Sequence, residues 1–246
     1  MDSKGAVFCK YCKEEISGNF CSNCGQPLSL NRIDGKYILT EVSRVLNFDR
    51  GFLYTVKRLL IKPGETVRDF LENDRRRLVK PVVFLLFCSV IYALVQQWLH
   101  FEDTYYASTQ NEQLKDSYIL VLSDWMRNHY GFTNIIMAIF MAPWLRWFYK
   151  KAGYNIYENL ILLFFLMGMG MLIATLFGMV EGIFNLPVFI AGTTIAIAYS
   201  IWGIGQFFPG RRWVAYLKAT LVYAMGYLSI VVVFAIIGIL LDIVLK

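Results

Sequence analysis

Four cysteines near the start of the chain have the spacing of a metal site. Two residues separate Cys9 from Cys12 and Cys21 from Cys24, and eight residues lie between the two pairs. Two residues between cysteines allow one tight turn to direct two thiolates at the same ion, and two such turns complete a tetrahedral site of four sulfurs. Soft thiolate ligands in this geometry favour Zn2+, with iron as the main competitor. We therefore predict a four-cysteine zinc ribbon over residues 1–28.

The predicted metal site is closed. Four protein ligands leave no position for water or substrate, so the zinc is expected to be structural and not catalytic. A segment this short cannot build a hydrophobic core, and metal binding supplies the folding free energy instead. The alternatives are two disulfides or four idle thiols, and a cytoplasmic location disfavours the disulfides. The fifth cysteine, Cys88, stands alone in an apolar run.

The rest of the chain has the composition of a membrane protein. Of its 246 residues, 57% are apolar and only 17% are charged, whereas soluble domains carry about 25% charged residues. Five apolar runs follow, each close to the roughly 20 residues that a helix needs to cross about 30 Å of hydrocarbon. The predicted fold class is an all-α integral membrane protein with about five transmembrane helices and a small N-terminal zinc ribbon. Its membrane domain covers 82–246, with helices near 82–99, 132–148, 160–180, 186–204 and 221–241.

Between the cysteines and the apolar runs, residues 29–81 carry apolar side chains at helical spacing. One stripe lies within 38–46 and a second within 52–60, before Pro63 and Gly64 interrupt the pattern. We predict amphipathic juxtamembrane helices, which either pack on the protein's own membrane domain or lie flat on anionic lipid. A basic run closes this region as a candidate lipid or partner surface: Arg75, Arg76, Arg77 and Lys80.

The distribution of Lys and Arg predicts the orientation of the chain. The start of the chain has no apolar stretch of the signal-peptide type, so we expect the N-terminus in the cytoplasm. Five crossings then place the basic segments 75–80, 146–151 and 211–218 inside and the acidic loop 100–131 outside. Pro143 makes the second run the weakest, but removing that crossing would break this agreement. We expect a multipass cytoplasmic (inner) membrane protein with an external C-terminus.

The order of these features resembles a bacterial family of zinc-ribbon multipass membrane proteins that is catalogued as a domain of unknown function. The resemblance rests on the CxxC and CxxCG pairs, the segment 62–71, the triple-arginine segment and Lys80-Pro81-Val82. It runs from the first cysteine into the first membrane helix. It implies a bacterial inner-membrane location and does not imply an activity.

Two histidines flank the predicted outer loop. His100 and His129 could bind an external metal together with Glu102 and Asp103, because these side chains offer the ligand atoms that transition metals prefer. The preferred interpretation is that all four are solvated loop residues. No HExxH pattern and no P-loop occurs in the chain.

Other polar or sulfur-containing groups in the apolar runs have structural interpretations. The acids Glu158, Glu181 and Asp242 lie at helix borders and are expected to be interfacial. The segment 167–171 alternates methionine and glycine. Alternate residues of a helix point about 200° apart, so we favour close helix packing through the glycines over copper binding.

Three classes of function compete. The leading hypothesis is a non-enzymatic membrane adaptor or regulatory protein, in which the ribbon or the juxtamembrane helices bind a protein partner and the other helices anchor it in the lipid bilayer. The alternative is a transporter or channel for a small or lipid-like solute. The odd number of helices weakens this alternative, because many transporters are built from two repeated halves. An intramembrane enzyme ranks third, because no nucleophile, base or open metal position can be assembled. Nucleic-acid binding is not expected, because the membrane topology already accounts for the positions of the Lys and Arg residues. The sequence assigns no oligomeric state.

Overall fold

The computed structural model describes residues 7–9, 12–16, 21–25, 51–102, 121–122, 125–126 and 129–245. The chain divides into two compact units, residues 1–44 and 45–246, and each is described by itself. The stripe predicted within 38–46 lies outside the described residues. Most of the predicted outer loop, including Asp103, also lies outside them.

The first unit contains two short strands. Strand β1 (Val7–Phe8) pairs antiparallel with β2 (Glu15–Ile16), with Val7 opposite Ile16. The backbone N–H of Cys9 donates to the Glu14 carbonyl oxygen at 2.8 Å and continues the ladder. This pairing holds the two ends of the first cysteine turn together.

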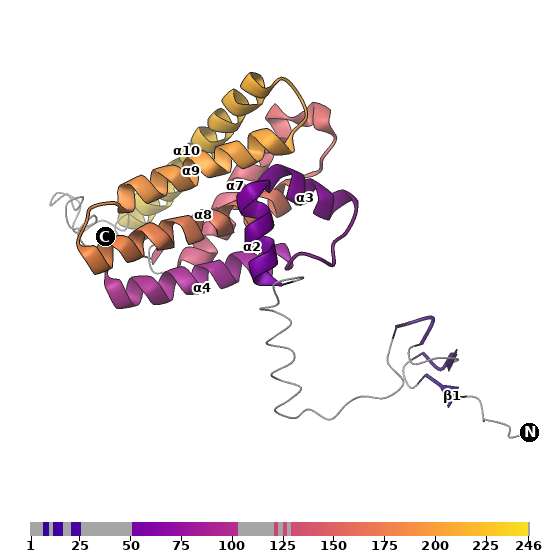
Figure 1. Ribbon diagram of the computed structural model, residues 1–246. Coiled ribbons are helices and arrows are strands. Elements are labelled where there is room, and N and C mark those ends of the chain that lie inside the picture. Colours follow the sequence, from indigo (N-terminus) through magenta and orange to yellow (C-terminus); the bar gives the residue numbers. More distant parts are fainter. Residues whose placement is uncertain are drawn as a thin grey trace, which may run out of the picture. The chain divides into compact units, whose positions relative to one another are not determined.

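In the second unit, the described residues form helices joined by short connections (Figure 1). Two short helices precede the long ones. In chain order the elements are α2 (Phe52–Ile61), α3 (Pro63–Glu72), α4 (Pro81–Leu99), α7 (Tyr130–Phe148), the 3-10 turn η2 (Lys150–Ala152), α8 (Ile156–Phe184), α9 (Phe189–Phe207) and α10 (Arg212–Leu245).

Four of these helices are long and apolar enough to cross a membrane, judged by length and composition: Pro81–Leu99, Ile156–Phe184, Phe189–Phe207 and Trp213–Leu241. Helix α7 overlaps the predicted run 132–148 but is not among the four. Asn134, Pro143 and Arg146 reduce its hydropathy. The four helices support a multipass helical membrane protein, and a fifth crossing requires a separate argument.

Local sequence signals explain where several helices begin and end. Helix α8 starts with a capping box, in which the Asn155 side chain accepts from the Glu158 N–H and the Glu158 side chain accepts from the Asn155 N–H. Proline occupies the first turn of both α3 and α4, where no backbone N–H is needed. Asn185, with φ of 54°, ends α8 in the left-handed conformation.

Helix α8 lies between α4 and α9 and forms the centre of the bundle (Figure 1). Gly168 allows α4 to approach closely, because a Cβ there would lie 2.8 Å from the Phe84 ring. Phe84 is fully buried and packs on Phe165 of α8. This arrangement agrees with helix packing as the role of glycine in the methionine and glycine segment.

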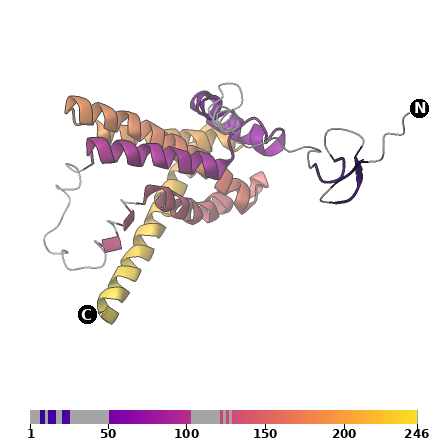
Figure 2. The same cartoon turned by 90° about the horizontal axis from the view of Figure 1, so that it is seen from below.

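Helix α10 is the least covered of the four long apolar helices. Only 17% of its most apolar window is buried, compared with 56% for α8. Its C-terminal half extends away from the other helices in Figure 2. Most of its surface is therefore available to lipid.

Candidate metal centre and juxtamembrane docking site

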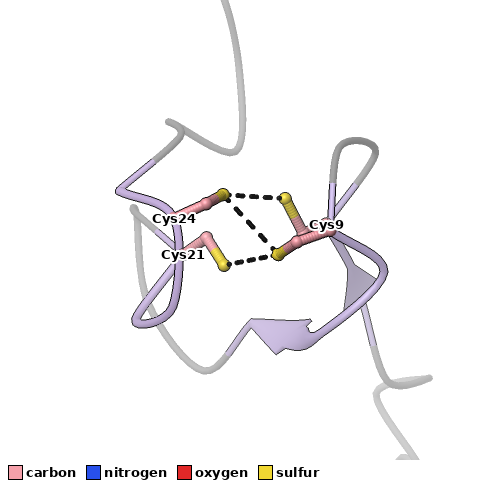
Figure 3. Close-up of side chains that lie close together, drawn as sticks. Cys9, Cys21 and Cys24 are labelled. Carbon is pink, nitrogen blue, oxygen red and sulfur yellow. Dashed lines mark hydrogen bonds between the residues drawn. The ribbon is translucent and has the colours of Figure 1, made fainter.

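The four predicted cysteine ligands form one cluster. Their sulfur atoms all lie within 4.8 Å of one another. The sulfur–sulfur distances are 3.4 Å for Cys12 and Cys21, 3.5 Å for Cys9 and Cys24, and 3.6 Å for Cys12 and Cys24. Figure 3 shows the side chains of the two cysteine turns pointing toward one another. The predicted cluster is therefore confirmed as a group that could bind a metal ion.

The sulfur separations fit a tetrahedral metal and are too long for disulfides. Four sulfurs placed about 2.3 Å from a tetrahedral ion are about 3.8 Å apart, close to the separations of 3.4 to 3.6 Å in the cluster. A disulfide needs about 2.05 Å, and all four cysteines are free thiols. These separations fit a metal cluster and do not fit the alternative of two disulfides.

Each cysteine turn contains one residue in the left-handed conformation. Gly25 has φ of 72° and donates its N–H to the Cys21 carbonyl oxygen at 2.9 Å. Lys13 occupies the equivalent position of the first turn. It has φ of 60° and donates its N–H to the Cys9 carbonyl oxygen at 2.9 Å. Glycine adopts this conformation without steric cost, whereas lysine does not. The second turn is therefore the less strained of the two.

The Cys12 and Cys21 thiols of the cluster differ in the direction of their pKa shifts. A hydrogen bond from the backbone of Cys24 is the largest influence that lowers the pKa of the Cys21 thiol. For Cys12, a backbone hydrogen bond at Glu14 acts to lower the pKa, but the contact with the Cys21 sulfur and burial outweigh it and raise the pKa. The Cys21 thiol is therefore the one of this pair that becomes a thiolate first.

In the second unit, α3 docks on the C-terminal end of α9. The Gly64 N–H donates to Gln206 Oε1 at 2.8 Å. The Arg68 guanidinium donates to the carbonyl oxygens of Gln206, at 3.0 Å, and Phe207, and it lies 6.0 Å from the centre of the Phe207 ring. A cation on the last carbonyls of a helix is favourable, because these groups lack partners within the helix and carry the negative end of its dipole.

Helix α2 is fixed to the same bundle. The buried Tyr199 hydroxyl donates to the Leu59 carbonyl oxygen at 2.8 Å, and the Leu59 side chain is fully buried. The N–H of Val79 donates to Thr55 Oγ1 at 3.1 Å, which joins α2 to the segment before α4. Of the two predicted environments for the juxtamembrane helices, packing on the protein's own membrane domain is the one that α2 and α3 show.

The predicted basic run lies between α3 and α4, and its side chains are exposed. Buried Leu78 and the Val79 hydrogen bond fix its C-terminal part. Arg77 Nε lies 3.2 Å from Asp74 Oδ2, and Arg75 donates to the Leu71 carbonyl oxygen at 3.2 Å. The structure places Arg75, Arg76, Arg77 and Lys80 together at the start of α4, and it does not test whether they bind lipid or a partner.

Three basic segments lie at one end of the helical unit. The Tyr154 hydroxyl donates to Glu72 Oε1 at 2.7 Å, which joins the α7–α8 turn to α3. Tyr149 stacks on Phe208 with ring centres 3.9 Å apart and donates to the Ala215 carbonyl oxygen at 2.5 Å, which joins the same turn to the start of α10. Segments 75–80, 150–151 and 211–218 are therefore neighbours.

Burial and the contact with Glu72 affect the Tyr154 hydroxyl. Burial first, and then the hydrogen bond to the Glu72 carboxylate, raise the pKa of Tyr154 to about 12. The hydroxyl therefore remains protonated and continues to donate to Glu72 across the neutral pH range.

One sequence interpretation is corrected by the structure. Glu102 is not a solvated loop residue, because only 2% of it is exposed and its carboxylate accepts a hydrogen bond from the buried Tyr92 hydroxyl. The buried Phe101 packs on Gly178 and Phe189 and draws the chain after α4 back onto the bundle. The sequence around Glu102 is acidic, and nothing in it indicates that this one carboxylate is buried. His100 and His129 are exposed and belong to no metal cluster among the described residues.

The border acids have structural partners. Glu158 completes the capping box of α8, and Glu181 Oε2 accepts the N–H of Phe189 at 2.6 Å in the first turn of α9. Their placement at helix ends agrees with the interfacial interpretation. The side chain of Asp242 lies outside the described residues.

Comparison with known proteins adds one family match. A family model described as "Protein of unknown function (DUF3667)" matches residues 49–93, which contain α2, α3, the basic run and most of α4. The match leaves out the four cysteines of the cluster and the helices after α4, so it covers a smaller part of the chain than the resemblance seen in the sequence. No curated protein and no solved structure matches.

Proposed function

We propose that this chain is a non-enzymatic membrane adaptor, in which a structural zinc module binds a protein partner and the helices hold the module at the cytoplasmic membrane of a bacterium. The observation that carries the proposal is the set of four sulfur atoms within 4.8 Å of one another. Four thiolates fill the coordination sphere of zinc, so the ion would stabilise a surface and would not activate water. Zinc is favoured because a tetrahedral set of soft ligands suits it.

The topology we propose has five crossings. Helix α4 starts at the end of the bundle where the three basic segments lie, and the turn after α7 returns to that same end through Tyr149 and Tyr154. If α4 crosses the bilayer, the chain between α4 and α8 must cross back. Helix α7, with 19 residues, supplies about 28 Å of that return. Because Lys and Arg are enriched in cytoplasmic loops, the end of the bundle that carries them is expected to face the cytoplasm.

A crosslinked pull-down from native membranes tests the adaptor function. Wild type is compared with Cys21→Ser plus Cys24→Ser, and bound zinc is measured in each by mass spectrometry. Cys88→Ser is the matched control, because Cys88 is buried in α4 and lies outside the cluster. We expect the double variant alone to lose both zinc and the specific partner while the membrane protein persists. Loss of zinc with unchanged partners would reject the adaptor function.

Reporter fusions test the topology separately. A phosphatase that is active only outside the cytoplasm is joined after Gly153 or after Lys246. Five crossings predict an inactive fusion at Gly153 and an active fusion at Lys246. Activity at Gly153 and none at Lys246 would instead show four crossings, with α7 not spanning the membrane.

A second candidate function, a channel for a small uncharged solute, is favoured by a cavity inside the bundle. The cavity has a volume of about 200 Å³ and no charged residue among the described residues that line it. Its lining includes Tyr92, Asn134 and Tyr223. Ala196→Leu should fill it, and Ala198→Leu, two positions along on the exposed face of α9, is the matched control. Glycerol flux into liposomes that falls only with Ala196→Leu would support a channel, and no flux in the wild type would reject it for this solute.

A further inference from the structure

A second cavity lies at the end of the bundle where the basic segments gather. It has a volume of about 290 Å³ and is formed by the end of α7, the turn η2, the α9–α10 connection and the first turns of α10. Three of its lining residues are lysines, Lys150, Lys151 and Lys218, and no acidic residue lines it among the described residues. The cavity is therefore surrounded by positive charge.

The lysine from α10 is held in place. Lys218 Nζ donates to the Phe148 carbonyl oxygen at 3.2 Å and lies 5.7 Å from the centre of the Tyr149 ring. Tyr149 is 8% exposed and is itself fixed by stacking on Phe208. The hydrogen bond and the cation–π contact reduce the side-chain entropy that binding would otherwise cost.

No salt bridge among the described residues involves a lysine of the cavity. The salt bridges among the described residues join Arg58 to Asp69, Lys62 to Glu65 and Arg77 to Asp74. Like charges that share one cavity repel each other, and an anion bound between them removes that repulsion.

Exposed tryptophans indicate the depth of the cavity. Trp147 precedes the lining residue Phe148 and is 59% exposed, and Trp213 in the first turn of α10 is 84% exposed. Tryptophan in this position is typical of the headgroup level of a bilayer. Phosphate is the anion that phospholipids present at this level, and basic pockets between membrane helices bind such headgroups.

We propose that this cavity is a phosphate-binding site, filled by the headgroup phosphate of an anionic phospholipid. The three lysine ammonium groups form charge-assisted hydrogen bonds to the phosphate oxygens. A free phosphate has the same chemistry, so the test must separate the two sources. The site rests on the helical unit alone and does not depend on the zinc module or its partner.

The test uses the purified full chain in nanodiscs of phosphatidylcholine containing phosphatidylglycerol, followed by native mass spectrometry of the lipid that remains bound. The test variant is K150Q/K151Q/K218Q. The matched control is K57Q/R58Q/K62Q, which removes the same charge from exposed side chains in and directly after α2 and not from the cavity. We expect wild type and control to retain phosphatidylglycerol and the test variant to bind it on the order of 100-fold more weakly.

Two further measurements complete the test. K150Q/K151Q changes only the exposed turn, so it keeps the test valid if loss of Lys218 disturbs the fold, and it should weaken binding on the order of 10-fold. Inorganic phosphate added at millimolar concentration separates the sources: retained lipid supports the headgroup, and displaced lipid supports a free phosphate at the same site. Equal retention by wild type and both cavity variants, or equal loss in the K57Q/R58Q/K62Q control, would overturn the proposal.

Discussion

Replacing Gly64 by alanine should detach the α2–α3 pair from the end of α9. A Cβ at this position would lie 2.3 Å from the Phe207 backbone nitrogen and 2.5 Å from the Gln206 carbonyl carbon. These are backbone atoms, which cannot rotate away as the tip of a side chain can. Helix α3 must therefore move outward by about 1 Å to restore ordinary packing distances.

The expected destabilisation has three contributions. Overpacking costs about 1–3 kcal/mol. The 2.8 Å hydrogen bond from Gly64 to Gln206 is lost at the new separation, at a cost of about 1 kcal/mol. Alanine returns about 1 kcal/mol of helix propensity relative to glycine. The net cost of docking is therefore about 1–3 kcal/mol, which corresponds to a roughly 5- to 150-fold larger undocked population.

Limited trypsin digestion of the purified chain measures this population. Cleavage after Arg58 requires detachment, because the next residue, Leu59, is fully buried. When docking is fast relative to cleavage, the cleavage rate follows the undocked population. Gly170→Ala is the matched control, since its Cβ would meet Ala196 at an ordinary 3.7 Å. Cleavage of Gly64→Ala at the wild-type rate would refute the docked arrangement.

Four further substitutions test the docking site and the cysteine cluster. Arg68→Met keeps the length of the side chain but removes its donors to the end of α9, so cleavage after Arg58 should rise about 10-fold; an unchanged rate would contradict the capping role. Tyr199→Phe removes only the hydroxyl bonded to Leu59 and should cost about 1 kcal/mol, measured as a lower unfolding temperature than that of the exposed control Tyr157→Phe. Gly25→Val places a β-branched residue at φ of 72° and should weaken zinc binding roughly 5- to 30-fold, whereas Lys13→Gly should strengthen it. Chelator competition measures both zinc affinities. Tighter zinc binding by Gly25→Val than by Lys13→Gly would reject the strain argument.

Features that depend on neighbouring residues were predictable from the sequence. The cysteine cluster follows from two short spacings, because each turn brings its own pair of thiolates together. The predicted run 160–180 lies inside α8, which extends to Ile156–Phe184. The extension at its start follows from the capping box of Asn155 and Glu158, which apolar content alone does not reveal.

Features that depend on residues far apart in the chain were not predictable. Arg68 and the end of α9 are separated by 138 residues, and nothing in either segment specifies the other. The burial of Glu102 depends on where Phe101 packs, which is a property of the assembled bundle. The basic cavity likewise combines two connections that the topology argument had treated as separate loops.

The docking of α3 on α9 also sets an order of events during biosynthesis. Gly64 is made 142 residues before Gln206, and at 5 to 20 residues per second the ribosome needs roughly 7 to 28 s to reach it. During this interval α2 and α3 lack the end of α9 that Gly64 and Arg68 contact, although α4 and α8 are already available to Phe52 and Phe70. Protection of the α2–α3 pair from cleavage would therefore report that α9 has been inserted in the correct orientation, which provides a natural readout of completed membrane assembly.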